Sequence, residues 1–210
     1  MVVIVPAIIG QEFKEVNAKI ASVEGLVSWV QLDVIDGRFA PNFSWDNPAD
    51  LADLPGTAKL EAHLMIESPE LEIMEWQRVA DRVLVHYEST NQLEAILQQF
   101  ENSVSKFGLA LLMDTPLEPL ESLWPKLNHV QLMGIERIGF HGQPFDERVI
   151  ERVRTVRAKL PHATIAVDGG VTLSNAAALV KAGATHLVVG SAIWNSGDIA
   201  GTIKQFQNAI

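Results

Sequence analysis

The sequence predicts a (β/α)8 TIM barrel, and three observations favour this fold class. Short runs rich in valine, isoleucine and leucine alternate with longer stretches whose apolar residues recur at helical spacing. Continuous apolar strands separated by helices are typical of a parallel sheet that helices cover. The 210 residues divide into eight such units of about 26 residues, near the lower limit of about 200 residues for this barrel.

Eight segments are expected to form the strands, in chain order: Val2–Pro6, Ser28–Val34, Lys59–Ile66, Arg82–Tyr87, Phe107–Met113, His129–Gly134, Thr164–Asp168 and His186–Gly190. A helix is expected after each of them. The clearest amphipathic stripe consists of Leu93, Ile96, Leu97, Phe100 and Val104. The last predicted helix carries its stripe on Ile199, Ile203, Phe206 and Ile210.

An open, doubly wound sheet is the alternative fold. It would require a glycine-rich turn after the first strand, whereas this chain has Pro6-Ala7-Ile8-Ile9-Gly10 and no GxGxxG motif. No linker rich in proline, glycine and serine divides the sequence. Residues 1–210 are therefore expected to form one barrel domain.

Composition excludes several classes of function. The chain has 16 basic and 26 acidic residues, a net charge of −10, which is the wrong sign for binding nucleic acid or an anionic membrane. It has no cysteine, so a metal would need histidine, carboxylate or amide oxygen ligands. No segment approaches the roughly 18 apolar residues of a membrane span, and residues 1–10 lack a positively charged region. A soluble cytoplasmic protein is expected.

Polar residues near the carboxyl ends of the predicted strands are the candidates for catalysis, because TIM barrels build their sites there. Four strands direct acids, imidazoles or amides toward one opening: Gln31 with Asp33, Glu61 with His63, His86 with Glu88, and Asp168. One such residue alone is more often a helix cap or a structural group. The combination of Asp33, His63 and Asp168 instead indicates a functional site.

Two glycine-containing segments are suited to binding a phosphate. Gly169 and Gly170 precede a helix expected to start near Thr172, and Gly190-Ser191-Ala192 follow the eighth strand. Backbone N–H groups at such places can face an anion, and phosphate sites of these barrels follow strands seven and eight. An acidic protein can thus bind a phosphate through main-chain dipoles.

The sequence resembles the ribulose-phosphate 3-epimerase family over nearly its whole length. The most specific motif is DxxDGxFxPN at Asp33–Asn42. Further similar segments are Pro6-Ala7-Ile8-Ile9 with Phe13, Ala62-His63-Leu64-Met65, His86, Gly108–Leu111 with Thr115-Pro116, Met133, Gly139–Gln143, Val167–Val171, Ala182-Gly183-Ala184 and Gly190–Ile193. The resemblance implies a barrel of the ribulose-phosphate-binding type.

The resemblance also implies epimerisation of a ketose phosphate, such as ribulose 5-phosphate or xylulose 5-phosphate, at carbon 3 through an enediolate. Asp33 and Asp168 would exchange protons on opposite faces of the substrate. This chemistry needs one ionised and one protonated acid, which unlike surroundings or a cation can provide. A divalent metal (magnesium, manganese, iron or zinc) would be held by Asp33, His63, Asp168 and, less securely, Gln31.

The remaining implied site residues fall into two groups. Those near the phosphate are Gly139, Gly142, Gly169, Gly170, Gly190 and Ser191. Those in the substrate pocket are Ala7, Ile35, Met65, His86 and Met133. A homo-oligomer is expected, since outer faces of barrels commonly pair symmetrically.

The sequence departs from the family pattern at several positions. Gln31 replaces a histidine ligand, and an amide oxygen suits magnesium or manganese better than zinc. Lower metal affinity or a different metal is therefore expected. Ala7 and Gly10 replace serines, and Ile35 replaces a methionine.

The loop after strand six contains Glu136-Arg137-Ile138 and is one residue longer than in the family. The identity of the sugar is therefore left open. Arg137 and His141 in this loop could contact an anion, although a solvated surface charge is the default for Arg137.

Two alternative functions remain. One is a lyase or decarboxylase of a related phosphate-binding barrel, but those carry a DxKxxD pattern and Asp33–Asp36 contains no lysine. The other is a sugar-phosphate-binding relative that has lost catalysis, as the replacements at Gln31 and Ala7 would allow. It predicts ligand binding without turnover.

Overall fold

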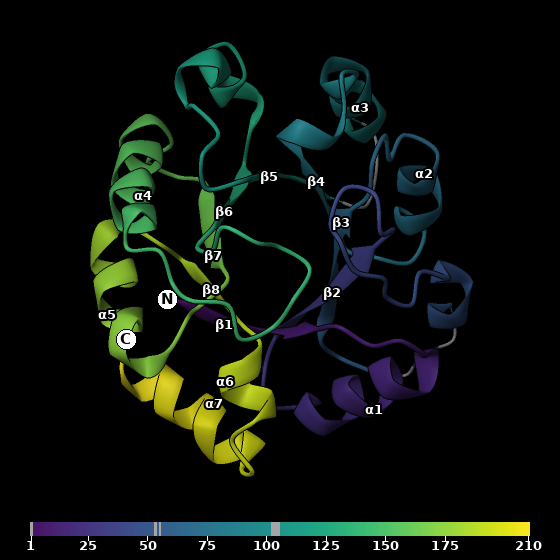
Figure 1. The fold of residues 1–210 in the computed structure, drawn as a ribbon, viewed down its shortest axis with the longest axis vertical. Coiled ribbons are helices and arrows are strands. Elements are labelled where there is room, and N and C mark those ends of the chain that lie inside the picture. Colours follow the sequence, from purple (N-terminus) through teal and green to yellow (C-terminus); the bar gives the residue numbers. More distant parts are fainter. Residues whose placement is uncertain (1, 53, 55, 102–105) are drawn as a thin grey trace.

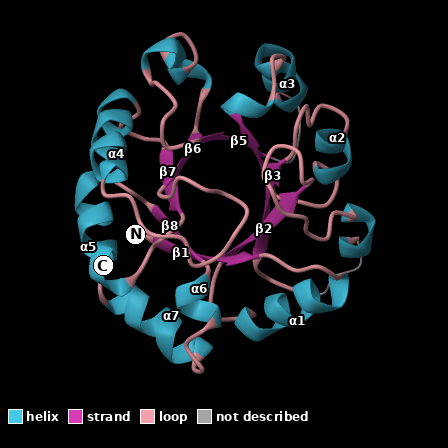
Figure 2. Ribbon diagram, in the orientation of Figure 1, coloured by secondary structure: helices cyan, strands magenta, loops and turns pink. Residues whose placement is uncertain are grey.

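Eight parallel strands close into a barrel in the order β1 to β8 in the computed structural model, which describes residues 2–52, 54, 56–101 and 106–210 (Figure 1). The strands are β1 (Val3–Ile8), β2 (Trp29–Ile35), β3 (Lys59–Met65), β4 (Arg82–His86), β5 (Lys106–Leu111), β6 (His129–Met133), β7 (Thr164–Asp168) and β8 (His186–Val189). Helices surround the barrel on its outside (Figure 2). The prediction of a TIM barrel is confirmed.

The predicted strand ends agree with the structure to within two residues. The two largest differences are in the fifth strand, which was expected to end at Met113 and ends at Leu111, and in the first, which was expected to end at Pro6 and continues to Ile8. Proline lacks an N–H group and so favours a strand end. Here β1 continues because Ala7 and Ile8 pair with Gln31 and Leu32 of β2.

The helices are α1 (Phe13–Val23), α2 (Glu72–Trp76), α3 (Leu93–Phe100), α4 (Arg148–Lys159), α5 (Leu173–Ala182), α6 (Ser191–Trp194) and α7 (Ile199–Asn208). Four short 3-10 helices are η1 (Pro48–Leu51), η2 (Tyr87–Ser89), η3 (Glu118–Leu120) and η4 (Trp124–Lys126). None of the described helices combines the length and the apolar character needed to cross a bilayer. Val104, at the end of the predicted stripe on α3, lies outside the described residues.

The expectation of an α-helix after every strand is wrong at two places, where only 3-10 helices follow the strand in the described part of the chain. Among the described residues, β2 is followed by η1 alone, and β5 by η3 and η4. Each of these 3-10 helices has a proline, Pro48, Pro119 or Pro125, in its first two positions. Proline is tolerated in the first turn of a helix but not in its interior, so each of these prolines stops a helix that would begin earlier in the connection.

The apolar core lies mainly between the strands and the surrounding helices, with Val30, Leu64, Val130 and Leu187 wholly buried in it. The inside of the barrel is more polar than the branched aliphatic layers typical of this fold. Buried polar residues on the strands include Gln31, Glu61, His63, Arg82, His86, His129 and Gln131. Since buried polar groups are costly unless they are paired, their partners define the interior.

Candidate active site

Two carboxylates and an imidazole meet inside the barrel. Asp33 lies on β2, His63 lies beside it on β3 in register, and Asp168 ends β7. The Nδ1 atom of His63 is 3.1 Å from Asp33 Oδ1 and 3.4 Å from Asp168 Oδ2. One potential ligand atom from each residue lies within 4.8 Å of the other two. The residues are therefore close enough to act on one substrate or to hold one cation.

Ser44, just after the DxxDGxFxPN motif, holds the backbone beside the first of these carboxylates, and Asp36 of the motif holds the loop after it. Ser44 Oγ donates to the carbonyl of Asp33 at 2.8 Å and accepts from the N–H of Ile35 at 2.9 Å. Asp36, the second acid of the motif, accepts hydrogen bonds from the backbone N–H groups of Arg38 and Phe39. Asp36 is thus a structural residue that shapes the loop, whereas the side chain of Asp33 points into the barrel.

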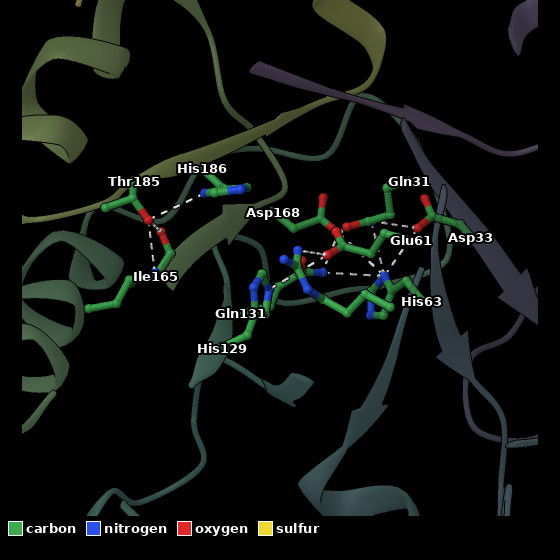
Figure 3. Close-up of polar contacts among 11 residues, drawn as sticks. Gln31, Asp33, Glu61, His63, His129, Gln131, Ile165, Asp168, Thr185 and His186 are labelled. Atoms are coloured by element: carbon green, nitrogen blue, oxygen red, sulfur yellow. Dashed lines mark hydrogen bonds and ion pairs between the residues drawn. The ribbon is translucent and has the colours of Figure 1, made fainter. Parts of the chain in front are cut away.

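Two glutamine side chains also reach the carboxylates (Figure 3). The Nε2 group of Gln31 donates to Asp33 Oδ1 at 2.7 Å and to Asp168 Oδ2 at 2.8 Å. Gln131, on β6, donates to Asp168 Oδ2 at 3.0 Å. Gln131 was missed in the sequence, although the alternation of His129, Gln131 and Met133 on one strand could have indicated an inward polar side chain.

A chain of imidazoles continues away from the carboxylates. His63 Nε2 lies 2.9 Å from His86 Nε2, and His86 Nδ1 lies 3.3 Å from Glu88 Oε2. Burial lowers the pKa of His63, but the hydrogen bonds to Asp168 and Asp33 outweigh it and raise that pKa to about 9. Burial lowers the pKa of His86 to about 4. We therefore assign the donor role in this contact to His63 and the acceptor role to neutral His86.

The glycine-rich segments come together around one cavity above the carboxylates. Its lining includes Asp33, His63 and Asp168 together with Gly139, Gly142, Gly169, Gly170, Gly190 and Ser191. The loop between β6 and α4 lies across the barrel mouth (Figure 1). Asn42 of the DxxDGxFxPN motif donates to the carbonyl of Gly139 at 2.7 Å and holds this loop. All six predicted phosphate residues therefore share a cavity with the predicted acid–base pair.

The predicted pocket residues separate into two sets. Ala7, Met65 and Met133 line the cavity. Ile35 packs with the two methionines in a buried apolar cluster, and His86 lies behind His63, so neither is among the residues that line the cavity. Ile35 and His86 thus support the pocket wall and the imidazole chain.

The loop residues left open in the sequence have different places. His141 lines the cavity, and its buried Nε2 has no hydrogen-bond partner among the described residues. Burial lowers the pKa of His141, while the charges of Asp33 and Asp168 oppose this. Arg137 is exposed, with its guanidinium 4.7 Å from the ring centre of Phe140.

Substituting Gly170 should destabilise the fold more than substituting a glycine of the same conformation elsewhere. Gly170 has φ +66°, and a Cβ atom there would lie 2.7 Å from the Cα of Phe145. We expect Gly170→Ala to lower the free energy of unfolding by about 1–3 kcal/mol from backbone strain, plus the cost of this contact. Urea unfolding provides the measurement.

Gly25→Ala is the matched control, because Gly25 has φ +74° and a Cβ atom there would have no neighbour within 4 Å. The control should show the strain alone. Equal losses in the two variants would contradict the close packing of Gly170 against Phe145.

Comparison with known proteins identifies the family. The family model described as "Ribulose-phosphate 3 epimerase family" matches residues 3–194. The chain belongs to this family. The epimerase-family chain is 34% identical to the chloroplastic ribulose-5-phosphate-3-epimerase of Arabidopsis thaliana, over 97% of its own length and 75% of the relative. It is 30% identical to the ribulose-phosphate 3-epimerase of Bacillus subtilis, with both chains covered completely. The predicted enzyme class, an isomerase acting on carbohydrates, is confirmed at the level of the family.

Two solved structures share the fold of this epimerase-family chain at low sequence identity. The 3-hexulose-6-phosphate synthase of Salmonella typhimurium superposes with a TM-score of 0.70 at 16% identity, covering 99% of this chain and 97% of the other. The orotidine 5'-phosphate decarboxylase of Pyrococcus horikoshii gives 0.68 at 19% identity, covering 99% and 98%. At these identities the similarity establishes the barrel fold alone.

Proposed function

We propose that this family member epimerises a phosphorylated ketose at carbon 3, such as ribulose 5-phosphate or xylulose 5-phosphate, with Asp33 and Asp168 as the acid–base pair. One carboxylate removes the carbon-3 proton, the electron pair moves toward the neighbouring carbonyl to form an enediolate, and the other carboxyl returns a proton to the opposite face. The supporting observation is that two buried carboxyls from β2 and β7 line one cavity beside the glycine-rich segments.

Burial around Asp33 favours its protonated form. Burial raises the pKa of Asp33, which His63 partly opposes through its hydrogen bond. A raised pKa favours the protonated form, so the carboxyl of Asp33 is suited to the role of proton donor. Epimerisation needs one protonated and one ionised acid, since equal states would leave one step without a donor or an acceptor.

The phosphate and the sugar are proposed to occupy different parts of the cavity. Backbone N–H groups around Gly139, Gly142, Gly169, Gly170, Gly190 and Ser191 would bind the phosphate oxygens. Ala7, Met65 and Met133 would pack against the sugar. Such packing excludes water from the enediolate and strengthens the electrostatic interactions around it.

Asp33, His63 and Asp168 bring together two carboxylates and an imidazole, a common ligand set for divalent cations, but the amide NH2 of Gln31 faces both carboxylates. When bound, a divalent cation would stabilise negative charge on the substrate oxygens. Gln31 could supply its amide oxygen only after its amide turns over, since Nε2 faces the carboxylates. The Oε1 atom of Gln31 is buried and has no partner among the described residues.

Exchange of the carbon-3 proton with solvent deuterium tests the proposal. We expect purified, metal-supplemented protein to exchange this proton in at least one ketose phosphate. Proton NMR measures the exchange as loss of the carbon-3 proton signal. Absence of exchange with ribulose, xylulose and hexulose phosphates would contradict it. Binding of a ketose phosphate without exchange would instead support the alternative hypothesis that this protein binds sugar phosphates and has lost catalysis. A lyase has less support, because the position of its motif lysine is occupied by Ile35, buried against the methionines.

We further propose that residues 1–210 act as one domain and form a homo-oligomer in the cytoplasm. Support for self-association comes from exposed apolar side chains at α2, where Leu71 is 78% exposed and Met74 is 52% exposed. Light scattering after size-exclusion chromatography measures the mass in solution. A monomer at micromolar concentration would contradict the expected oligomer.

A further inference from the structure

The amide nitrogen of Gln31 lies among all three candidate cation ligands. It is 2.7 Å from Asp33 Oδ1, 2.8 Å from Asp168 Oδ2 and 3.2 Å from His63 Nδ1. The amide nitrogen of Gln131 is 3.0 Å from Asp168 Oδ2 and 3.4 Å from His63 Nδ1. Figure 3 shows both side chains turned toward this group. The region that a cation bound to the three residues has to enter is thus contacted by two amide NH2 groups.

The two amide NH2 groups contact the same carboxylate oxygens that a bound cation would contact. A carboxyl oxygen that carries no proton accepts hydrogen bonds, and the two hydrogens of one NH2 group can serve two carboxyl groups at once. The Nε2 group of Gln31 therefore links Asp33 to Asp168, and Gln131 adds a donor to Asp168 from β6, the strand next to β7.

The oxygen atoms of both amides make no hydrogen bond among the described residues. The Oε1 atoms of Gln31 and Gln131 are buried and unpaired among the described residues. An amide oxygen turned toward two carboxylates is favourable only if a cation lies between them. Cation binding therefore requires Gln31 to turn over and to give up both of its hydrogen bonds, and it competes with Gln131 for Asp168.

We propose that the carboxamides of Gln31 and Gln131 substitute for the divalent cation in this site. They hold the two carboxylates in place as positioning residues, so that carbon-3 proton exchange proceeds without bound metal and cations bind weakly. The exchange part rests on the function proposed above. The part on cation affinity stands independently of it, since it follows from the hydrogen bonds in the protein itself.

Cation affinity measured by titration calorimetry on chelator-treated protein tests this directly, with Zn²⁺ and Mn²⁺ as the probes. Gln31→His removes the competing NH2 group and adds an imidazole, so we expect at least tenfold tighter Zn²⁺ binding than in the wild type. Gln131→Leu should tighten binding several-fold, and Gln131→Met provides a second variant if the first folds poorly. Gln205→Leu, at an exposed position on α7, is the control and should change nothing.

Deuterium exchange at carbon 3, measured with excess chelator and again with added metal, completes the test. Wild-type exchange should survive the chelator. Loss of exchange with chelator and recovery with one equivalent of Zn²⁺ would overturn the proposal, as would equal Zn²⁺ affinity in the wild type and Gln31→His. Affinities that move as expected, with no exchange in any sample, would overturn the proposed function and support the cation competition.

Discussion

Replacing Asp168 with asparagine should lower kcat/KM for carbon-3 epimerisation by about 10²- to 10⁴-fold, the range for losing a general acid or base. Asparagine keeps the shape of the side chain, and its amide oxygen can still accept a hydrogen bond from Gln31, so the barrel should fold. The asparagine side chain can neither take nor give a proton in this reaction. Steady-state kinetics with a ketose phosphate measures the effect.

The Asp168→Asn variant should retain proton transfer on one of the two faces of carbon 3. Because Asp33 remains, Asp168→Asn should exchange the carbon-3 proton of the one epimer whose hydrogen faces Asp33, without converting it. Asp33→Asn should show the converse preference. Asp114→Asn, at an exposed position paired with Arg148, is the control and should behave as the wild type. Equal residual exchange of both epimers in both variants would contradict a pair of acids on opposite faces.

Removing Arg82 should cost more stability than any other single ion-pair change in the described part of the chain. Arg82 Nη1 lies 2.5 Å from Glu61 Oε2 inside the barrel, where their side chains are 10% and 1% exposed. Arg82→Met would leave the Glu61 carboxylate buried without its cation. We expect the free energy of unfolding at pH 8 to fall by about 3–5 kcal/mol, as for other buried pairs that lose one partner. Urea unfolding measures it.

The loss should shrink as the pH falls. Burial raises the pKa of Glu61, and Arg82 opposes that shift, so the variant raises this pKa further above its unfolded value. A group whose pKa is higher in the folded state stabilises the fold below its unfolded pKa, and this contribution is lost as pH rises through the folded pKa. The difference between wild type and Arg82→Met should therefore be smaller near pH 5 than at pH 8.

Two further variants provide the controls. Lys126→Met breaks an exposed pair with Glu94 and should change stability by no more than about 1 kcal/mol. Arg82→Met combined with Glu61→Gln should recover part of the loss, because it removes the buried charge. A pH-independent loss in the single variant would contradict an uncompensated carboxylate as its cause.

Much of the fold was predictable from the sequence because strand patterning is local. Runs of branched apolar residues identified all eight strands, and period-two alternation placed Gln31 with Asp33 and Glu61 with His63 on inward faces. The connections were less predictable. The helix expected after β5 is replaced by η3 and η4, since Pro119 and Pro125 limit helix length in a way that apolar spacing does not reveal.

The sequence by itself determined which residues point inward and which glycines can approach a ligand, since both follow from neighbours along the chain. Only the closed barrel decided which of these side chains touch. Gln31 and Asp168 are 137 positions apart and meet at 2.8 Å. Gln131, a buried amide on β6, gains its role only because closure brings β2, β6 and β7 around one centre. Hydrogen bonds depend on distance and direction to within fractions of an ångström, and strand patterning carries no such information.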